Sequence, residues 1–389
     1  MHGDTAYNFS TVPNILCEPG AASNRLGEVI STQLPTARRV LIVTDPGLRK
    51  AGLVNAPQRS LQQAGLVVDV FPEVSADPPE AVVEAAVARA RAHGADLVIG
   101  LGGGSSMDVA KLAAALARNG QALKEAYGIG KVEGKRLLLA QIPTTAGTGS
   151  EVTNIAIVTT GTTTKMGVVA PQLYADLAIL DATLTLGLPP AVTAATGIDA
   201  MVHAIEAYTS KHKKNPISDM LARQALALLS TQLLTACEDG QNLRARQATL
   251  LGACLAGQAF SNAPVAAVHA LAYPIGGIFH VPHGLSNSLV LPHVLRFNMP
   301  AACALYAELA EIVAPEVKGS DEARAEGMIA TLQHIAVQTG IARRLRDVGI
   351  GATDLDRLAD DAMLQTRLLG NNPRELTREH ARAIYAAAL

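Results

Sequence analysis

The sequence predicts an α/β domain built on a parallel, Rossmann-like sheet, followed by an all-helical domain. In the first half of the chain, short β-rich apolar runs alternate with helical segments, which is the pattern of parallel strands joined by crossover helices. Beyond residue 187 the strand-like runs give way to long Ala- and Leu-rich helical stretches. The length of 389 residues suits two domains at roughly 150 residues each.

Four strands are expected in the first domain, at residues 40–44, 66–70, 96–100 and 137–142. Between the second and the third, residues 79–93 carry Val and Ala at helical spacing. A break at Leu188-Pro189-Pro190 precedes predicted helices over 218–236 and 244–260. We therefore expect domains at 1–187 and 188–389.

Composition excludes several classes of function. There are 32 Lys and Arg against 34 Asp and Glu, aromatic residues make up 3%, and Trp is absent, so nucleic acid and membrane surfaces are not expected partners. The four cysteines are far apart and form no C-x-x-C pair, which is typical of a reducing compartment. No basic segment followed by an apolar run opens the chain, so we expect no signal peptide and a cytoplasmic location.

One region is unusual in charge. The 49 residues from Gln247 to Leu295 contain no Asp, Glu, Lys or Arg. Polar residues interrupt this stretch too often for a membrane span, so buried interior is the better interpretation. It contains four histidines, His269, His280, His283 and His293.

A glycine-rich loop follows the third predicted strand. Residues 100–106 read GLGGGSS and precede a helix expected to begin near Met107, with Ser105 or Ser106 as its cap. Glycines let the backbone approach an anion, and a helix start offers unpaired N–H groups, so this loop suits a pyrophosphate. It is not the G-x-G-x-x-G fingerprint, and a simple tight turn is the alternative.

A second polar loop, residues 143–151, follows the fourth predicted strand in the same way. Ligands of open α/β sheets bind beyond the carboxyl ends of the strands, so both loops are expected to face one nucleotide. Asp45, at the end of the first predicted strand, would bind ribose hydroxyls and repel a 2′-phosphate, which favours NAD over NADP. Alternatively, Asp45 is a turn residue before Pro46.

The second half contains candidate metal ligands. Asp199 and His203 are four residues apart on a predicted helix and share one face. Such a pair is more often a surface hydrogen bond than a metal clamp, so further ligands are needed. The charge-free stretch supplies His269 and His283, whose neutral imidazoles are suited to a divalent metal.

These motifs together resemble the iron-containing, or group III, alcohol dehydrogenases over essentially the full chain. The resemblance rests on Gly102, Gly103, Gly104 and Ser105 with Asp108 and Lys111, on Pro143-Thr144-Thr145 with the segment 147–151, on Asp199 with His203, on His269 with His283, and on Asn372-Pro373-Arg374. It implies a dinucleotide-binding domain, a helical metal-binding domain, and an active site in the cleft between them. The implied metal ligands are Asp199, His203, His269 and His283. The implied cofactor-binding residues are Asp45, Gly102, Gly103, Gly104, Ser105, Ser106, Asp108, Thr144, Thr145, Thr148 and Lys165.

The chain departs from the family at Tyr273 and Asp77. Tyr273 stands where many members have a second histidine near the substrate, so Tyr273 is the candidate proton relay, although a phenol titrates near 10. Asp77 stands where an asparagine near the cofactor is common. His280 is the main rival of His283 as a ligand, and we place it behind the ligands or facing the substrate.

The expected reaction is NAD-linked interconversion of a short alcohol and its carbonyl. A divalent cation held by one carboxylate and three imidazoles keeps a charge of about +1 and can polarise a substrate oxygen. The family name suggests Fe²⁺, whereas the ligand set also suits Zn²⁺. Alternatives are a hydroxy-acid dehydrogenase or maleylacetate reductase-like enzyme, a lyase similar to dehydroquinate synthase, and a non-catalytic nucleotide-binding protein. We expect a homodimer or a larger homo-oligomer.

Overall fold

The computed structural model describes residues 6–161 and 164–389. One compact unit is Thr11–Gly187, and the other combines Leu188–Leu389 with the few described residues that precede Thr11. Those residues were assigned to the first domain by the sequence analysis. The structure ties them to the helical unit instead, because the backbone of Ser10 donates to Asn262 Oδ1 (2.7 Å) and accepts from Asn262 Nδ2 (2.8 Å). Residues 1–5, on which the expectation about a signal peptide depends, lie outside the described residues.

The first unit contains a six-stranded sheet in the order β1-β9-β6-β4-β2-β3, in which all pairs are parallel, as predicted. A smaller sheet has the order β5-β8-β7. The strands are β1 (Ile15–Cys17), β2 (Arg39–Val43), β3 (Val67–Phe71), β4 (Leu97–Gly102), β5 (Gly128–Ile129), β6 (Leu138–Pro143), β7 (Ile155–Thr160), β8 (Thr164–Val169) and β9 (Leu177–Leu180). The four strands expected from the sequence are β2, β3, β4 and β6, each within two residues of its expected ends.

The chain order changes direction between β2 and β4. From β2 the chain adds β3 on one side, whereas β4, β6 and β9 follow one another on the other side. The crevice beyond the carboxyl ends of two such strands is where open α/β sheets bind ligands. Asp45 and the loop after Gly102 follow these two strands, so the fold places both at the expected binding edge.

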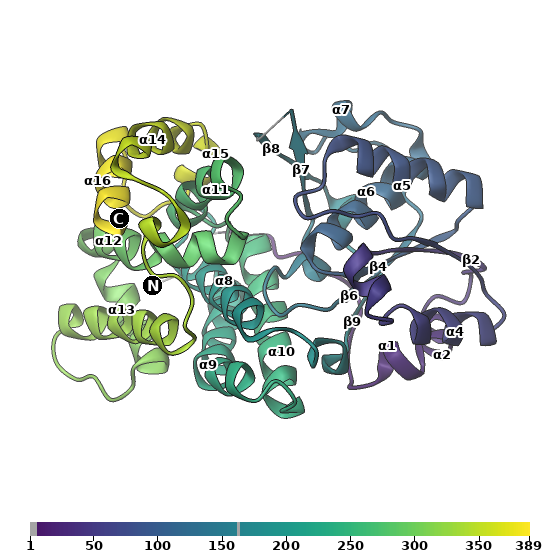
Figure 1. Ribbon diagram of the computed structural model, residues 1–389, viewed down its shortest axis with the longest axis horizontal. Helices are drawn as coiled ribbons and strands as arrows, with labels where there is room; N and C mark the ends of the chain where they lie inside the picture. The colour runs from purple at the N-terminus through teal and green to yellow at the C-terminus, as the bar shows by residue number, and fades with distance from the viewer. Residues whose placement is uncertain (1–5, 162–163) are drawn as a thin grey trace. The chain divides into compact units, whose positions relative to one another are not determined.

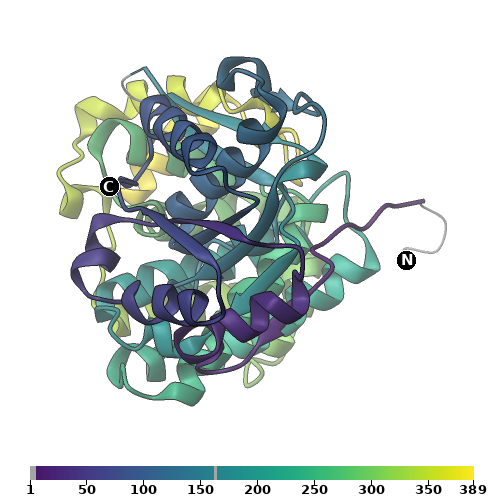
Figure 2. The same ribbon diagram turned by 90° about the vertical axis from the view of Figure 1, so that its right-hand side faces the viewer.

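Helices cover both faces of this sheet (Figure 1). Helices α5 and α6 pack on one face, and α1, α2 and α4 gather near the other; Figure 2 shows the same grouping from a second direction. The helices of this unit are α1 (Ala21–Asn24), α2 (Leu26–Gln33), α3 (Pro46–Lys50), α4 (Asn55–Gln63), α5 (Glu80–His93), α6 (Gly104–Asn119) and α7 (Leu123–Ala126), with 3₁₀ turns at Ser150–Val152, Pro171–Leu173 and Ala182–Thr185.

Helix α6 begins earlier than the sequence suggested. Its first residue is Gly104 and its N-cap is Gly103, which has no side chain to cap the helix. The expectation that Ser105 or Ser106 caps it is wrong, because both lie inside the first turn. The free N–H groups of that turn are thus left without a side-chain cap, which suits an anion.

Every regular element described after Leu188 is a helix. The helices are α8 (Pro190–Tyr208), α9 (Pro216–Glu238), α10 (Leu243–Asn262), α11 (Ala267–Phe279), α12 (His283–Val313), α13 (Asp321–Gln338), α14 (Leu355–Met363), α15 (Thr366–Leu369) and α16 (Arg378–Ala388), with 3₁₀ turns at Leu345–Val348 and Ala352–Asp354. Helix α8 packs against α9, α10 and α12 and is buried over most of its length.

The charge-free stretch contains most of α10, all of α11 and the start of α12. Within the described parts of the chain, no single helix has the length and hydropathy of a membrane span. Helices α10 and α11 reach that threshold only when taken together, across a bend of 108°.

Candidate functional site

Helix α8 carries three acidic or imidazole side chains on one buried face. Asp199, His203 and Glu206 occur at intervals of four and three residues, which places them on the same side of a helix. Their exposed fractions are only 2%, 5% and 3%. Buried ionisable groups need partners, and the structure supplies them from α11 and α12.

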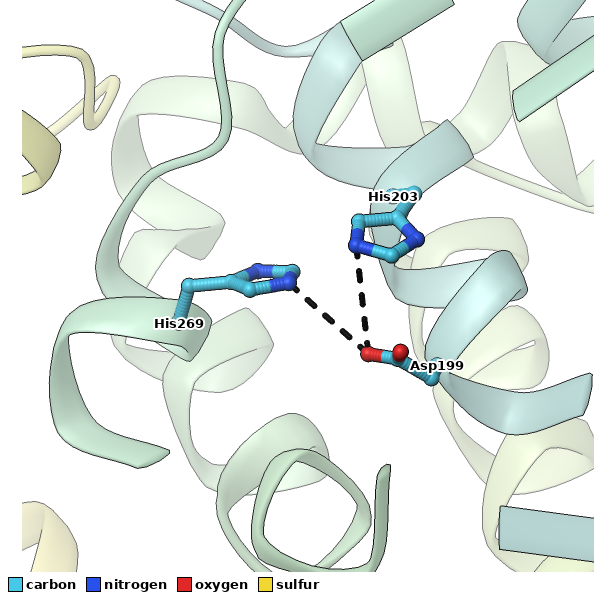
Figure 3. Close-up of side chains that lie close together, drawn as sticks. All are labelled: Asp199, His203 and His269. Carbon is cyan, nitrogen blue, oxygen red and sulfur yellow. Dashed lines mark ion pairs between the residues drawn. The ribbon is translucent and has the colours of Figure 1, made fainter. Parts of the chain in front are cut away.

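Four of the sequence-predicted residues meet around one oxygen atom. Asp199 Oδ1 lies 3.9 Å from His203 Nε2, 3.8 Å from His269 Nε2 and 3.7 Å from His283 Nε2. Figure 3 shows His203 and His269 both directed at this oxygen from two different helices. The ligand atoms of Asp199, His203 and His269 all lie within 4.8 Å of one another. The His283 side chain is 42% exposed, so the cluster is accessible to solvent on the side of His283.

The donor set fits a divalent metal. Ligands about 2.1 Å from one ion lie roughly 3.0 to 3.4 Å apart in octahedral or tetrahedral geometry. The distances from Asp199 Oδ1 to the three Nε2 atoms, 3.7 to 3.9 Å, exceed the upper value by a few tenths of an ångström. Small movements of these side chains would bring all four ligand atoms into contact with one ion. One carboxylate oxygen with three imidazole nitrogens suits Fe²⁺, Zn²⁺ and similar ions.

The electrostatics of the cluster keep its carboxylate ionised. Burial acts to raise the pKa of Asp199, but the facing imidazoles of His203, His283 and His269 and a hydrogen bond from Asn287 bring the pKa below its ordinary value. An ionised carboxylate is the form that binds a metal.

Glu206 orients His269 and was not assigned a role from the sequence. Its Oε2 lies 2.6 Å from His269 Nδ1, and its Oε1 accepts the N–H of Val268 at 2.6 Å. A carboxylate acceptor keeps the proton on Nδ1 and leaves Nε2 available as a ligand. The sequence signal was the position of Glu206 three residues after His203 on the same helix face.

Ring stacking fixes His203. Its imidazole stacks between Phe260, at a centroid distance of 4.3 Å, and His269, at 4.7 Å. Phe260 lies in the charge-free stretch, so the apolar surroundings of the site also set the orientation of one of its imidazoles.

Asn287, on α12, lies among the same four residues. Its Nδ2 donates to Asp199 Oδ1 at 2.6 Å and is 3.3 Å from His283 Nε2 and 3.4 Å from His269 Nε2. Asn287 is fully buried. No motif in the sequence predicted a role for it.

The two residues expected to move protons lie in different surroundings. The Tyr273 ring is 5.8 Å from the His283 ring, centroid to centroid, and half-buried. His280 is exposed and ends α11 in the left-handed conformation, with φ of 56°. Its N–H donates to Gly276 O at 3.0 Å, so the structure gives His280 a backbone role as the C-cap of this helix.

The two polar loops of the first unit lie side by side. The N–H of Thr144 donates to Gly102 O at 3.0 Å. A Cβ atom on Gly104 would come within 2.9 Å of Thr148 Cγ2, so a larger residue at this position would force Thr148 to shift. Gly103, Ser105, Thr145 and Thr148 are half-buried, and Ser106 and Thr144 are buried.

Asp108 and Lys111 join helix α6 to the second loop. Asp108 accepts from Ser150 Oγ (2.6 Å) and from the N–H of Ile157 (2.9 Å), one bond to each carboxylate oxygen. The Lys111 ammonium is fully buried and donates to Ser150 Oγ (2.7 Å), Thr153 Oγ1 (3.1 Å) and Ile155 O (2.7 Å). Burial lowers the pKa of Lys111, although Asp108 acts in the opposite direction.

Two other expected cofactor residues have partners within the protein. Asp45 caps α3 by accepting the N–H of Leu48 at 3.0 Å, which uses one carboxylate oxygen. Lys165 forms an ion pair with Asp77, which adopts the left-handed region with φ of 51°. Asp77, the departure from the usual asparagine, thus engages one of the residues implied to bind the cofactor.

The late Asn372-Pro373-Arg374 motif is part of the helical core. Asn372 and Asn298 exchange amide hydrogen bonds of 2.7 and 2.9 Å. Arg374 lies over the Phe297 ring, 4.2 Å from its centroid, and donates to Phe297 O. This motif therefore anchors the C-terminal segment to α12.

Comparison with known proteins covers both units. The family model "Iron-containing alcohol dehydrogenase" matches residues 13–182, and "Fe-containing alcohol dehydrogenase family, C-terminal" matches residues 193–389. Long-chain-alcohol dehydrogenase 1 of Geobacillus thermodenitrificans (strain NG80-2) is 43% identical over 356 residues, which cover 90% of each chain.

Solved structures agree over the full length. A crystal structure of 1,3-propanediol oxidoreductase has a TM-score of 0.94 and 34% identity, covering 99% of this chain and 100% of that one. Sulfoacetaldehyde reductase from Bifidobacterium kashiwanohense, in complex with NAD⁺, has a TM-score of 0.88 and 27% identity, with 99% of each chain covered. The chain belongs to the iron-containing alcohol dehydrogenase family and is an oxidoreductase that acts on the CH–OH group of its donors.

Proposed function

We propose that this enzyme uses NAD(H) and a divalent metal, held by Asp199, His203, His269 and His283, to interconvert a short uncharged alcohol and its carbonyl. The observation that carries the proposal is the convergence of three imidazole nitrogens to within 3.9 Å of Asp199 Oδ1. A divalent cation bound there supplies a Lewis acid that polarises the substrate oxygen.

The remaining roles belong to the side chains around the ligands. Glu206 orients His269, and Phe260 holds the His203 ring by stacking. Tyr273, whose ring contacts the exposed ligand His283, is our candidate for carrying the alcohol proton away from the substrate. His280 remains the second candidate for proton transfer, because its exposed side chain lies only three residues before His283.

The nucleotide is proposed to bind at the start of α6. The uncapped N–H groups of that helix and the glycines of residues 102–104 suit a pyrophosphate, with Ser105, Ser106, Thr144, Thr145 and Thr148 around it. Both oxygens of Asp108 are already engaged, so we propose that it positions the second loop. Hydride transfer needs the nicotinamide next to the substrate carbon, so the cofactor and the substrate must meet during the reaction.

The substrate class follows from the charge pattern. The stretch around His269 and His283 has no Lys or Arg that could bind a carboxylate, which favours an uncharged alcohol over a hydroxy acid. Related proteins are named for long-chain alcohols, 1,3-propanediol and sulfoacetaldehyde, so the family accepts several substrates. A panel of short alcohols, diols and hydroxy acids would decide between these classes.

The metal proposal is tested by removing single ligands. We expect Asp199→Ala and His283→Ala to lose bound metal and alcohol oxidation together, because a buried three-ligand remnant binds a divalent ion weakly. His280→Ala is the matched control and should keep its metal. Elemental analysis on the same samples measures the metal and distinguishes iron from zinc. Full turnover by a metal-free variant would overturn the proposal.

The cofactor proposal is tested at Asp45. Replacing Asp45 with Asn removes the negative charge while keeping an oxygen that can cap α3, so we expect the preference for NAD⁺ over NADP⁺ to fall about tenfold or more. The ratio of kcat/KM for the two cofactors measures this. An unchanged ratio would assign Asp45 to helix capping alone.

A homodimer or larger assembly in the cytoplasm remains a prediction. Light scattering after size-exclusion chromatography measures the first part, and fractionation of the source cells measures the second.

A further inference from the structure

The amide of Asn287 lies among three of the proposed ligand atoms. Asn287 follows His283 by one helical turn on α12 and is fully buried. Its Nδ2 is 2.6 Å from Asp199 Oδ1, 3.3 Å from His283 Nε2 and 3.4 Å from His269 Nε2. A single side-chain nitrogen thus contacts three of the atoms that a metal would contact.

The contacts of this nitrogen are hydrogen-bond contacts to acceptor atoms of the proposed ligands. Asp199 is an acceptor, and His269 presents Nε2 as an acceptor because its proton is on Nδ1, which donates a hydrogen bond to Glu206. The shortest contact, at 2.6 Å, is a hydrogen bond from the amide to Asp199, and the two longer contacts reach the imidazole nitrogens of His269 and His283. The NH₂ group therefore lies against the carboxylate oxygen and the imidazole nitrogens whose lone pairs would bind a cation.

The oxygen of the same amide lacks the partners that the nitrogen has. Asn287 Oδ1 is buried and makes no hydrogen bond to any of the described residues. An unpaired buried acceptor is unfavourable because it has lost its hydrogen bonds to water. A half-turn of the carboxamide exchanges the oxygen and the nitrogen without changing the shape of the side chain.

We propose that Asn287 is a placeholder for the metal. In the metal-free enzyme its NH₂ group holds Asp199, His269 and His283 together. When the metal binds, the amide turns, because an NH₂ group is repelled by a cation and a carboxamide oxygen is a good ligand for one. Asn287 Oδ1 then faces the ion as a further oxygen ligand. This inference rests on the proposed metal site.

The test compares Asn287→Leu, which has a similar volume and no polar side-chain atoms, with Asn287→Asp, which keeps a side-chain oxygen but as a carboxylate cannot donate a hydrogen bond. In the leucine variant we expect a lower melting temperature of the metal-free enzyme and a rise in the metal dissociation constant of about tenfold to 100-fold, measured by chelator competition. The visible spectrum of the Co²⁺-loaded protein should gain intensity, because Co²⁺ absorbs more strongly as its coordination number falls.

The aspartate variant should also lower the melting temperature of the metal-free enzyme, because two carboxylates then face each other without a donor. Its Co²⁺ spectrum should keep the wild-type coordination number. If the leucine variant does not fold, Asn287→Ser, which is too short to reach the ion, takes its place. Asn298→Leu removes another buried amide on the same helix, away from the ligands, and should lower stability without changing the metal affinity or the spectrum.

Wild-type metal affinity and Co²⁺ spectrum in the leucine variant, or in the serine variant that replaces it, would overturn the inference while leaving the four-ligand site intact. Failure of the wild-type enzyme to bind Co²⁺ or Zn²⁺ would instead overturn the proposed function.

Discussion

Three aspartates that the sequence indicated as candidates for binding the metal or the cofactor have different neighbours in the structure, and these neighbours set their roles. Asp199 faces three imidazoles in a buried cluster. Asp108 uses both oxygens to hold the segment between Ser150 and Ile157. Asp45 caps a short helix with one oxygen. The role of a carboxylate is thus set by which donors the fold brings to it, and spacing along the chain gives only part of that information.

The role of Glu206 in orienting His269 for metal binding can be tested by a single substitution. In Glu206→Gln the amide group must place its NH₂ against either His269 Nδ1 or the N–H of Val268, so one contact becomes unfavourable. We expect the metal dissociation constant to rise about tenfold to 100-fold. Chelator competition measures it, with the exposed residue Glu311→Gln as the control. Unchanged affinity would leave Glu206 with a structural role only.

At the level of elements, α6 combines a binding surface with an anchor. Its first turn leaves N–H groups available, and Asp108 and Lys111, in the next two turns, fix the loop that follows β6. A loop held in place before binding loses less conformational freedom when the ligand arrives. Helix α6, which would bind the pyrophosphate, therefore also positions the loop that follows β6.

Ser150 links the two anchors, because it donates to Asp108 and accepts from Lys111. Ser150→Ala removes both bonds, and we expect the dissociation constant for NAD⁺ to rise about threefold to tenfold, with little change in kcat. Fluorescence titration with NADH measures the binding. Thr153→Ser, which retains its hydroxyl group, should bind as the wild type does. Equal affinity of the alanine variant would show that the loop is held by its remaining contacts.

For the whole molecule, the two units have separate cores and separate candidate ligands. A ligand that binds only the folded state stabilises it by about 2.7 kcal/mol at 100 times its dissociation constant. We expect metal to slow hydrogen exchange in α8 and α11, and NAD⁺ to slow it near residues 102–108 and 144–150. Mass spectrometry of exchanged peptides measures both, with chelator-treated enzyme as the reference. Metal-dependent protection confined to the first unit would contradict the assignment.

The family resemblance selected His283 over His280 as the fourth candidate ligand. The sequence by itself indicated the parallel sheet, the helical second half, the four strands β2, β3, β4 and β6, and Asp199, His203, His269 and His283 as candidates. These features depend on local periodicity, or on polar residues in an apolar context, and both can be read along the chain. It did not reveal β1 and β9, because strands of three and four residues are too short to show a pattern. It also placed the cap of α6 at a serine, although the helix starts before both serines.

Only the tertiary structure identified Glu206 and Asn287. Glu206 lies 63 residues from His269, and Asn287 lies 88 residues from Asp199, so no local pattern relates them. Hydrogen bonds and metal ligation act over about 3 Å, and side chains reach that distance only after helices α8, α11 and α12 have packed together. The sequence therefore indicates which residues are candidates for the site, whereas the packing of the helices decides which hydrogen-bond partner each polar atom has.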